Sequence, residues 1–395
     1  MPSNNATATD MRPEAELLLC CARTAMDAER AERIRQLLQE DINWDYLLQA
    51  AHKRRVVPLL YWHLNASGPE AVLDGHLDRF RAYFHHNSRH NLLLTAELCR
   101  ILSLFEAHGI SAIPFKGPVL AATLYGNLAL RQFGDLDIMV RKQDVLSAKD
   151  LLVAQGYRCQ RERTWEDRLV HGNGSIVDLH WGIAPGYFSF PLDPEHLWER
   201  AKPLSLGGTT ALTLSPEDLL LILCVHGAKH CWKRLKWICD VAELLRVHEG
   251  VDWEEVMAAA RTLGSWRMLC LGLFLAHDLL GAPLPREVWQ RVQPDHTVKA
   301  LATQVREQLY QEVNTPPLFL EASTRLFHLR MRERLRDRIM YCLRYFPRYY
   351  LSRATSPNAA DQEFLPLRPS FSFLHYLIRP FRLLGQYGLG SFRNR

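Results

Sequence analysis

The sequence contains no Cys-x-x-Cys pair, although it has nine cysteines. An odd number of cysteines without that spacing is not typical of a disulfide framework. It favours reduced thiols in a cytoplasm. The sequence also shows no internal repeat and no low-complexity segment. We therefore expect an ordinary globular protein that is not stabilised by disulfide bonds.

Signals for secretion or membrane insertion are absent as well. The first residues do not combine a basic stretch with a following apolar stretch, as a secretory signal would. No uncharged apolar run reaches the ~20 residues that a membrane-spanning helix needs. We expect a soluble, cytoplasmic protein without a transmembrane segment.

The net charge of +5 is small but unevenly distributed. Residues 325–353 contain nine arginines against only Glu333 and Asp337. Such an excess can attract phosphate-bearing partners or an anionic membrane surface, whereas the simpler interpretation is a solvated helix face. The sequence leaves the role of this stretch open.

The length of 395 residues exceeds one compact core, and 48% hydrophobic with 23% charged residues is ordinary for folded domains. Apolar residues recur at helical spacing before residue 108 and again after Ser215-Pro216, a typical helix start. We predict an α+β fold, in which a small mixed sheet lies between two helical regions. The predicted divisions are a disordered N-terminus (1–12), an N-terminal helical region (13–108), an α/β core (109–214), a C-terminal helical region (215–350) and a tail rich in proline, aromatic and basic residues (351–395).

Within the core, short apolar runs alternate with a helical pattern. Strands are predicted over 110–115, 136–140, 157–163 and 175–181, and a helix over 144–155 that ends at Gly156. The periodic stretch 119–125 lies between the first two strands. The order strand, helix, strand, helix, strand, strand is typical of a small mixed sheet backed by helices.

Two carboxylates flank Leu136 in the second predicted strand. Successive side chains of a strand point to opposite faces, so Asp135 and Asp137 share a face while Leu136 points into the core. Two carboxylates this close repel each other unless a cation lies between them. Magnesium accepts such oxygen ligands and leaves coordination positions open for phosphates.

A third carboxylate follows in the last predicted strand, where Asp178 and His180 share a face. If this strand lies beside the second one, Asp178 completes a cluster of three carboxylates. Such a cluster can hold two metal ions, one activating an attacking hydroxyl and one neutralising a departing pyrophosphate.

Several motifs surround these acids. They are Phe115-Lys116-Gly117, Leu124-Tyr125-Gly126, Arg131, Asp135-Leu136-Asp137 and Val177-Asp178-Leu179-His180-Trp181. Together they resemble the uncharacterised branch of bacterial nucleotidyltransferases within the polymerase-beta-like superfamily. The similarity extends over roughly residues 90 to 390. It includes His226, Lys229, His230, Trp232, Leu235, Trp237 and Asp240, and less specifically residues 376–380.

The resemblance implies that residues 109–214 form a catalytic core. Asp135 and Asp137 would bind the metal, Mg²⁺ or Mn²⁺, and Asp178 would be the third ligand and the base. The superfamily holds the triphosphate with a Gly-Ser turn, but Pro118 follows Gly117 here, so the serine hydroxyl is missing. Lys116 is a substitute that can approach a phosphate as a point charge.

Further residues are candidates for nucleotide binding. Arg131 is predicted to meet a phosphate, the alternative being a surface ion pair. His180, His226, Lys229 and His230 are predicted to face the nucleotide or the acceptor, because helical spacing puts the last three on one face. Zinc binding by this group and Cys231 is a less favoured alternative. Asp240 is expected to pair with Arg234 or Lys236, or to orient a histidine.

We therefore predict an enzyme that transfers a nucleoside monophosphate from an NTP to an acceptor hydroxyl or phosphate and releases pyrophosphate. The acceptor, whether a small molecule, a peptide or a glycan precursor, cannot be read from the sequence, and nucleic acid is a less favoured partner. The alternatives are a toxin-type transferase that modifies tRNA or protein, and a catalytically silent protein that binds nucleotide and serves in assembly.

Overall fold

The computed structural model describes residues 12–67, 72, 75–185, 188, 190–310, 317–343, 365 and 374. The chain divides into two compact units, Met1–Glu333 and Arg334–Arg395. In the second unit, residues 335–343 are helical. The predicted disordered N-terminus and nearly all of the predicted 351–395 tail lie outside the described residues. Everything below concerns the first unit.

The chain opens with helices, as the apolar periodicity predicts. The side chains of Asp27 and Asn43 cap α2 and α3 by accepting hydrogen bonds from the backbone N–H groups of Arg30 and Tyr46. The five helices are α1 (Pro13–Cys21), α2 (Ala28–Leu37), α3 (Trp44–Arg54), α4 (Val57–Ser67) and α5 (His76–Ala107).

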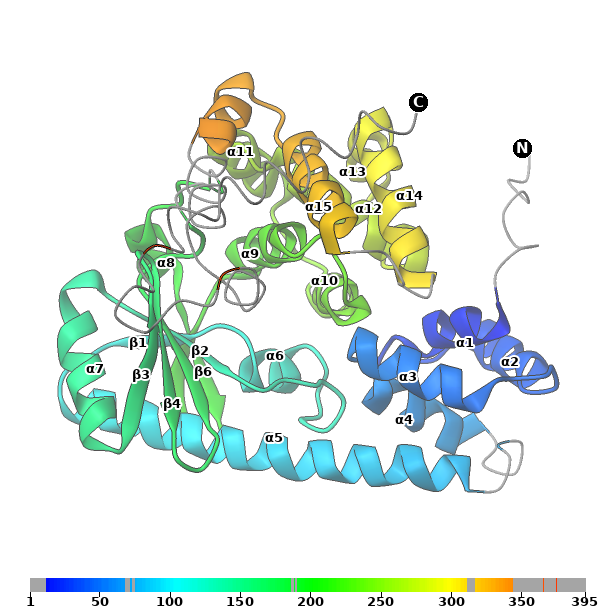
Figure 1. Ribbon diagram of the computed structural model, residues 1–395, viewed down its shortest axis with the longest axis horizontal. Coiled ribbons are helices and arrows are strands. Elements are labelled where there is room, and N and C mark those ends of the chain that lie inside the picture. The colour runs from blue at the N-terminus through cyan, green and yellow to red at the C-terminus, as the bar shows by residue number, and fades with distance from the viewer. Residues whose placement is uncertain are drawn as a thin grey trace. The chain divides into compact units, whose positions relative to one another are not determined.

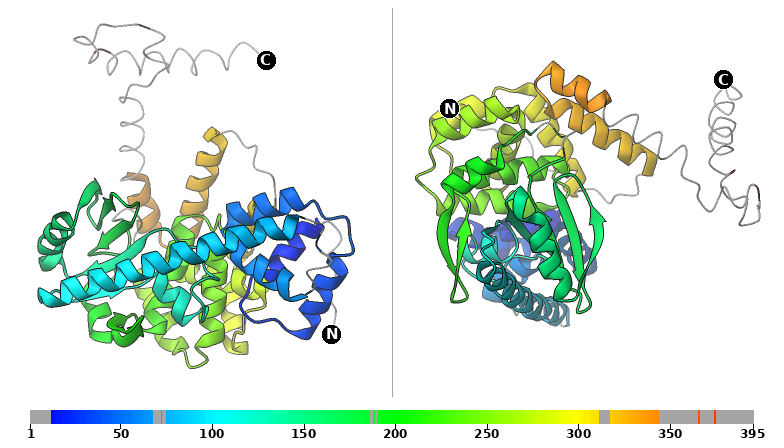
Figure 2. Two further views of the ribbon diagram at one scale, coloured as in Figure 1. Left: turned by 90° about the horizontal axis from the view of Figure 1, so that it is seen from below. Right: turned by 90° about the vertical axis from the view of Figure 1, so that its left-hand side faces the viewer.

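The long helix α5 connects the N-terminal helices with the sheet. Figure 1 and Figure 2 show it running from α3 and α4 to the strands. Its C-terminal half buries Leu94, Leu98, Ile101, Leu102 and Phe105 in the same apolar cluster as the central strands. This stripe at helical spacing therefore supports the sheet from one side.

The core contains the small mixed sheet that the sequence predicts. Its strands are β1 (Ala112–Pro114), β2 (Leu136–Val140), β3 (Tyr157–Glu162), β4 (Glu166–His171) and β5 (Ile176–His180), in the order β1-β2-β5-β4-β3. Strands β2 and β5 are parallel, and the other neighbours are antiparallel. Helices α6 (Pro118–Thr123) and α7 (Val145–Ala154) lie within this region of the chain.

Some elements of the core are not predicted from the sequence. Strand β4 is one, since the sequence indicates only a turn between the strands now seen as β3 and β5. Helix α8 (Pro194–Arg200) and the hairpin of β6 (Lys202–Leu206) and β7 (Thr209–Thr213) are the others.

The C-terminal helices begin where Ser215 predicts. Its side chain accepts a hydrogen bond from the N–H of Asp218. The helices are α9 (Pro216–Lys229), α10 (Leu235–Val247), α11 (Trp253–Leu263), α12 (Trp266–Leu280), α13 (Arg286–Val292), α14 (His296–Tyr310) and α15 (Pro317–Met331), of which α13 and α15 are not predicted. Within the described ranges, no helix is both long and apolar enough to cross a membrane. The predicted division at residues 108 and 214 stays a prediction.

Candidate active site

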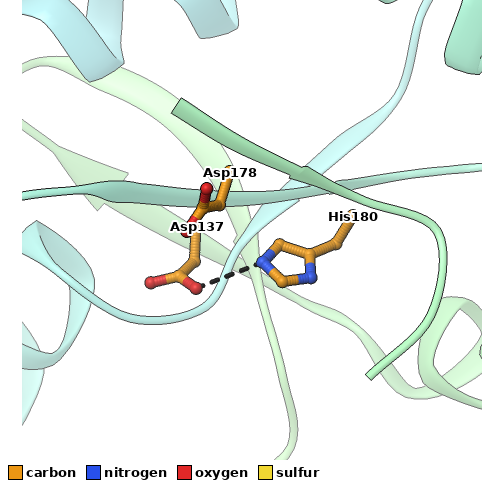
Figure 3. Close-up of side chains that lie close together, drawn as sticks. All are labelled: Asp137, Asp178 and His180. Atoms are coloured by element: carbon orange, nitrogen blue, oxygen red, sulfur yellow. Dashed lines mark hydrogen bonds and ion pairs between the residues drawn. The ribbon is translucent and has the colours of Figure 1, made fainter. Parts of the chain in front are cut away.

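Parallel pairing of β2 and β5 brings two of the predicted acids together. Asp137 pairs with Asp178, and Met139 with His180. Potential ligand atoms of Asp137, Asp178 and His180 all lie within 4.8 Å of one another. Figure 3 shows the three side chains converging, with the Nε2 of His180 3.2 Å from Asp137 Oδ1. The Asp137 and Asp178 side chains are only 10% and 8% exposed, so both carboxylates are held inside the protein.

Asp135 lies at the edge of this group. It immediately precedes β2, and its side chain is 43% exposed. The pKa of Asp135 is raised for two reasons. The surrounding protein partly removes the carboxylate from water, and the carboxylates of Asp137 and Asp178 repel its negative charge. Among the described residues it does not join the close group of Asp137, Asp178 and His180. Asp135 is thus the most accessible of the three predicted metal ligands.

The Lys116-Gly117 turn packs against the acidic strand. The ammonium of Lys116 lies 2.8 Å from Asp137 Oδ1. Gly117 has φ +52°, and a Cβ there would lie 3.1 Å from the Asp135 carbonyl oxygen, so the position favours glycine on both grounds. Burial alone would raise the pKa of Asp137, but Lys116 and His180 outweigh it and hold the pKa well below its usual range.

Arg168 is a site residue that the sequence analysis missed. It pairs with Asp178 across β4 and β5, and its Nε and Nη2 donate to the two carboxylate oxygens at 2.7 and 2.5 Å. Its Nη2 also lies 3.4 Å from Asp135. The bidentate contact raises the pKa of Arg168. Arg168 therefore holds both Asp178 oxygens.

Glu166 is a second missed residue, two positions earlier on β4. It pairs with His180 in the strand register, with its carboxylate 3.7 Å from His180 Nδ1. Arg163 and Arg161 contact the same carboxylate at 2.7 and 3.2 Å. Both missed residues lie on β4, whose mixed charged and apolar residues give no regular apolar pattern from which the strand could be predicted.

Arg131 is buried, which differs from the surface ion pair considered for it. Its guanidinium donates to both oxygens of Asp240 at 2.8 and 2.9 Å and to the Gly117 carbonyl at 3.3 Å. Tyr125 also donates to Asp240 at 2.8 Å. Asp240 was expected to pair with Arg234 or Lys236 or to orient a histidine. Its hydrogen bonds come from Arg131 and Tyr125 instead, while the charge of Lys236 acts on it and helps to lower its pKa. The Arg131 and Asp240 pair is too distant in sequence to be seen in a local pattern, and contact of Arg131 with a phosphate stays a prediction.

His226 and Lys229 of α9, and His230 directly after the helix, line the same cavity as the acids. This cavity measures about 340 Å³ and includes Lys236 and Trp237 of α10. Eight Lys or Arg side chains and five Asp or Glu side chains line it, so its charge suits a polyanionic ligand. In the part of the chain that the structure describes, neither possible metal-binding group contains Cys231, His226 or His230, which leaves the zinc alternative without support.

Comparison with known proteins decides the family. Residues 40–281 match the model of a family described as uncharacterised nucleotidyltransferase. The chain belongs to this family. The protein is thus a nucleotidyltransferase, a transferase enzyme. Its enzyme class and its mixed α+β fold are those that the sequence motifs predict. A search of curated proteins finds no match.

Two solved structures are similar to the nucleotidyltransferase over part of its length. The antibiotic-resistance factor ANT(2'')-Ia is 11% identical, with a TM-score of 0.29, covering 59% of this chain and 97% of that one. An antigenic nucleotidyltransferase-like protein from Paracoccidioides brasiliensis is 15% identical, with a TM-score of 0.31, covering 49% of this chain and 95% of that one. The family assignment rests on the family model.

Burial changes the titration of the basic groups that line the nucleotidyltransferase cavity. It lowers the pKa of Lys236 to about 7 and that of Lys229 to about 8. It also lowers the pKa of His230 to about 3 and that of His226 well below its usual range, and neighbouring cations add to both effects. Both histidines are therefore neutral at pH 7. His230 stacks on Trp237, with ring centroids 5.1 Å apart.

Proposed function

We propose that this nucleotidyltransferase moves a nucleoside monophosphate from an NTP such as ATP to an acceptor hydroxyl or phosphate, with release of pyrophosphate and with a requirement for Mg²⁺ or Mn²⁺. The observation that carries the proposal is the buried pairing of Asp137 with Asp178 beside His180, inside a cavity with excess positive charge. We also propose a cytoplasmic location, which the nine unpaired cysteines support.

The donor set fits a divalent cation. Asp135, Asp137 and Asp178 offer carboxylate oxygens, the ligands that Mg²⁺ and Mn²⁺ prefer, and His180 adds a nitrogen that Mn²⁺ accepts. Asp137 forms an ion pair with Lys116, and Asp178 forms one with Arg168. Both carboxylates therefore already bind positively charged groups, as they would bind a metal cation. When bound, the metal would neutralise phosphate charge and increase the acidity of the acceptor hydroxyl.

The protein residues around the acids would bind and orient the substrates. Lys116 and the Gly117 turn lie beside Asp135 and Asp137, where a triphosphate bridged by metal would bind. Lys236 lines the same cavity, where its ammonium donates to the Gln132 carbonyl at 3.0 Å and its charge acts on Asp135. Asp178 would accept the proton of the acceptor, but both of its oxygens are engaged by Arg168. Each of these oxygens keeps a second lone pair, so Asp178 can accept a proton while Arg168 holds its orientation.

The chemistry does not fix the acceptor. A small molecule, a peptide or a glycan precursor each supplies a hydroxyl or phosphate. The toxin-type and silent alternatives remain hypotheses, although a silent protein has no need to bury two carboxylates side by side.

Calorimetric titration with ATP, Mg²⁺ and then EDTA tests the proposal. We expect ATP to bind only with the metal, because the triphosphate and the carboxylates repel each other without it. Equal affinity in EDTA would remove the metal-bridged model. Asp137→Asn is nearly isosteric but removes a ligand charge, so it should keep the fold and abolish transfer. Asp150→Asn, at an exposed position on α7, is the matched control.

A further inference from the structure

A second basic group lines the cavity on the other side of His180 from Asp137. We call Arg161, Arg163, Glu166 and Lys229 the Glu166 cluster. Its two arginines contact the Glu166 carboxylate, which is only 6% exposed. Lys229 reaches the same cavity from α9. Two cations therefore contact one carboxylate, and the charge of Lys229 acts on it from across the cavity.

The strand register places Glu166, with the two arginines that contact it, further along the strands than the Gly117 turn. Gly117 packs on the carbonyl of Asp135, at the start of β2. Further along the two parallel strands come the Asp137 and Asp178 pair and then His180, which faces Glu166. The acids thus lie between the Gly117 turn on one side and Glu166 with Arg161 and Arg163 on the other. Lys229 lines a small adjoining pocket together with Lys116, so it is within reach of both sides.

The charge of the Glu166 cluster is not balanced within the protein. Three cations against one carboxylate leave a surplus of two positive charges, matching a phosphate monoester dianion better than a single carboxylate. Arg161 Nε is buried without a hydrogen-bond partner in the described structure. No hydrogen bond or ion pair between described residues engages the Lys229 ammonium. The cluster therefore has donors to spare for an anion.

We propose that Arg161, Arg163 and Lys229 form a subsite for a phosphate group carried by the acceptor. The inference rests on the proposed function, because it assigns the Gly117 end to the triphosphate and leaves the other end for the second substrate. A transfer reaction needs its two substrates on opposite sides of the reacting phosphorus. The acceptor would then present its hydroxyl to Asp178 while its own phosphate is held beyond His180.

The experiment uses the full chain saturated with Mg²⁺ and a non-hydrolysable ATP analogue, followed by titration with glycerol 3-phosphate or with glycerol. We expect glycerol 3-phosphate to bind and glycerol not to bind. Arg161→Gln with Arg163→Gln should weaken glycerol 3-phosphate binding about tenfold or more, since charge-assisted hydrogen bonds are lost. The affinity for the nucleotide analogue should change less than about twofold.

Two further variants guard against simple unfolding. Lys229→Gln removes an ammonium that holds no described partner, and it should weaken glycerol 3-phosphate binding without disturbing Glu166. Arg158→Gln, at an exposed position on the same strand as Arg161, is the matched control and should leave both affinities unchanged.

The possible results separate this inference from the proposed function. If the analogue does not bind even with Mg²⁺, the proposed function fails and the inference with it. If the analogue binds but loses affinity in parallel with glycerol 3-phosphate, the cluster holds the triphosphate and only the inference is overturned. Glycerol 3-phosphate binding that is unchanged in all variants also overturns it.

Discussion

At the scale of single residues, each acid of the site has a different electrostatic environment. Asp137 is buried beside Lys116 and His180, Asp178 is held by Arg168, and Asp135 is the most exposed of the three. The three aspartates can therefore serve three different roles in the site. Asp137 is suited to permanent ionisation and metal binding, whereas Asp178 is oriented by Arg168 and keeps a lone pair on each oxygen to accept a proton.

The role of Asp178 can be separated from that of Arg168. Asp178→Ala should keep NTP affinity, which rests on Asp135, Asp137 and Lys116, but slow pyrophosphate release by a factor of roughly 10² or more, as lost proton transfer implies. Arg168→Gln should instead destabilise the metal-free protein, because it leaves the buried Asp178 without its partner. Added Mg²⁺ should raise the melting temperature of this variant more than that of the wild type.

Melting curves with and without Mg²⁺, together with NTP titrations, measure both effects. If Asp178→Ala lowers stability and affinity together, Asp178 is a structural partner of Arg168 and not the base. An unchanged rate of pyrophosphate release would reject its catalytic role.

Lys236 makes the affinity for NTP depend on pH. Burial lowers the pKa of its ammonium to about 7, so the group loses its proton between pH 6 and 8. A triphosphate favours the charged form, and affinity should therefore be highest below pH 7 and fall above it. Lys236→Met should bind NTP more weakly and show a flatter profile over this range. Titrations at pH 6, 7 and 8 check this, and parallel profiles for the two proteins would contradict it.

At the scale of elements, a regular alternation of apolar residues predicts the two strands that carry the acids. A strand with a mixture of charged and apolar residues, such as β4, is not predicted in this way. Strands β2 and β5 alternate apolar residues with Asp137 and Asp178, so both their existence and their shared face can be inferred. Strand β4 reads Glu-Asp-Arg-Leu-Val-His, and its charged residues are buried only because β5 and neighbouring bases pair with them. Arg168 and Glu166 therefore depend on a register that no local pattern contains.

The α9–α10 connection holds the cavity wall through close packing. Cys231 and Trp232 have φ of +54° and +50°, which is unusual for residues other than glycine. The Trp232 ring lies over Gly227, where a Cβ would be 2.5 Å from it. This contact fixes the turn that follows His226, Lys229 and His230.

Gly227→Ala should consequently destabilise the protein by about 1–3 kcal/mol, since the ring cannot give way without shifting its neighbours. Gly250→Ala is the control, because a Cβ there meets nothing within 4 Å. Denaturant unfolding measures both variants. Equal stabilities would show that the Trp232 packing is softer than its geometry indicates.

At the scale of the whole first unit, helix α10 joins regions that are distant in sequence. Asp240 accepts from Arg131 in the sheet region, and Glu243 accepts from the N–H and hydroxyl of Thr24 at 3.1 and 2.7 Å. Thr24 lies before the matched range of 40–281, whereas Arg131 and Asp240 lie within it. Such contacts cannot be predicted from one sequence, because they depend on the packing of complete regions.

The Arg131 and Asp240 pair provides the last prediction. Burial would raise the pKa of Asp240, but Arg131 outweighs it and lowers the pKa, so the pair is fully ionised at pH 7. Asp240→Asn leaves a buried guanidinium without its countercharge and should cost about 3–5 kcal/mol of unfolding free energy. Arg131→Met with Asp240→Leu removes both charges and should recover most of that loss.

The double variant also tests whether the pair serves the site. Arg131 donates to the Gly117 carbonyl, and α10 carries Lys236 into the cavity, so NTP affinity should stay reduced even where stability returns. Glu249→Gln, an exposed change just after α10, is the control for altered charge alone. Denaturant unfolding and NTP titration on the four proteins give the result. If affinity recovers together with stability, the pair holds the fold only, and the Gly117 turn keeps its position without Arg131.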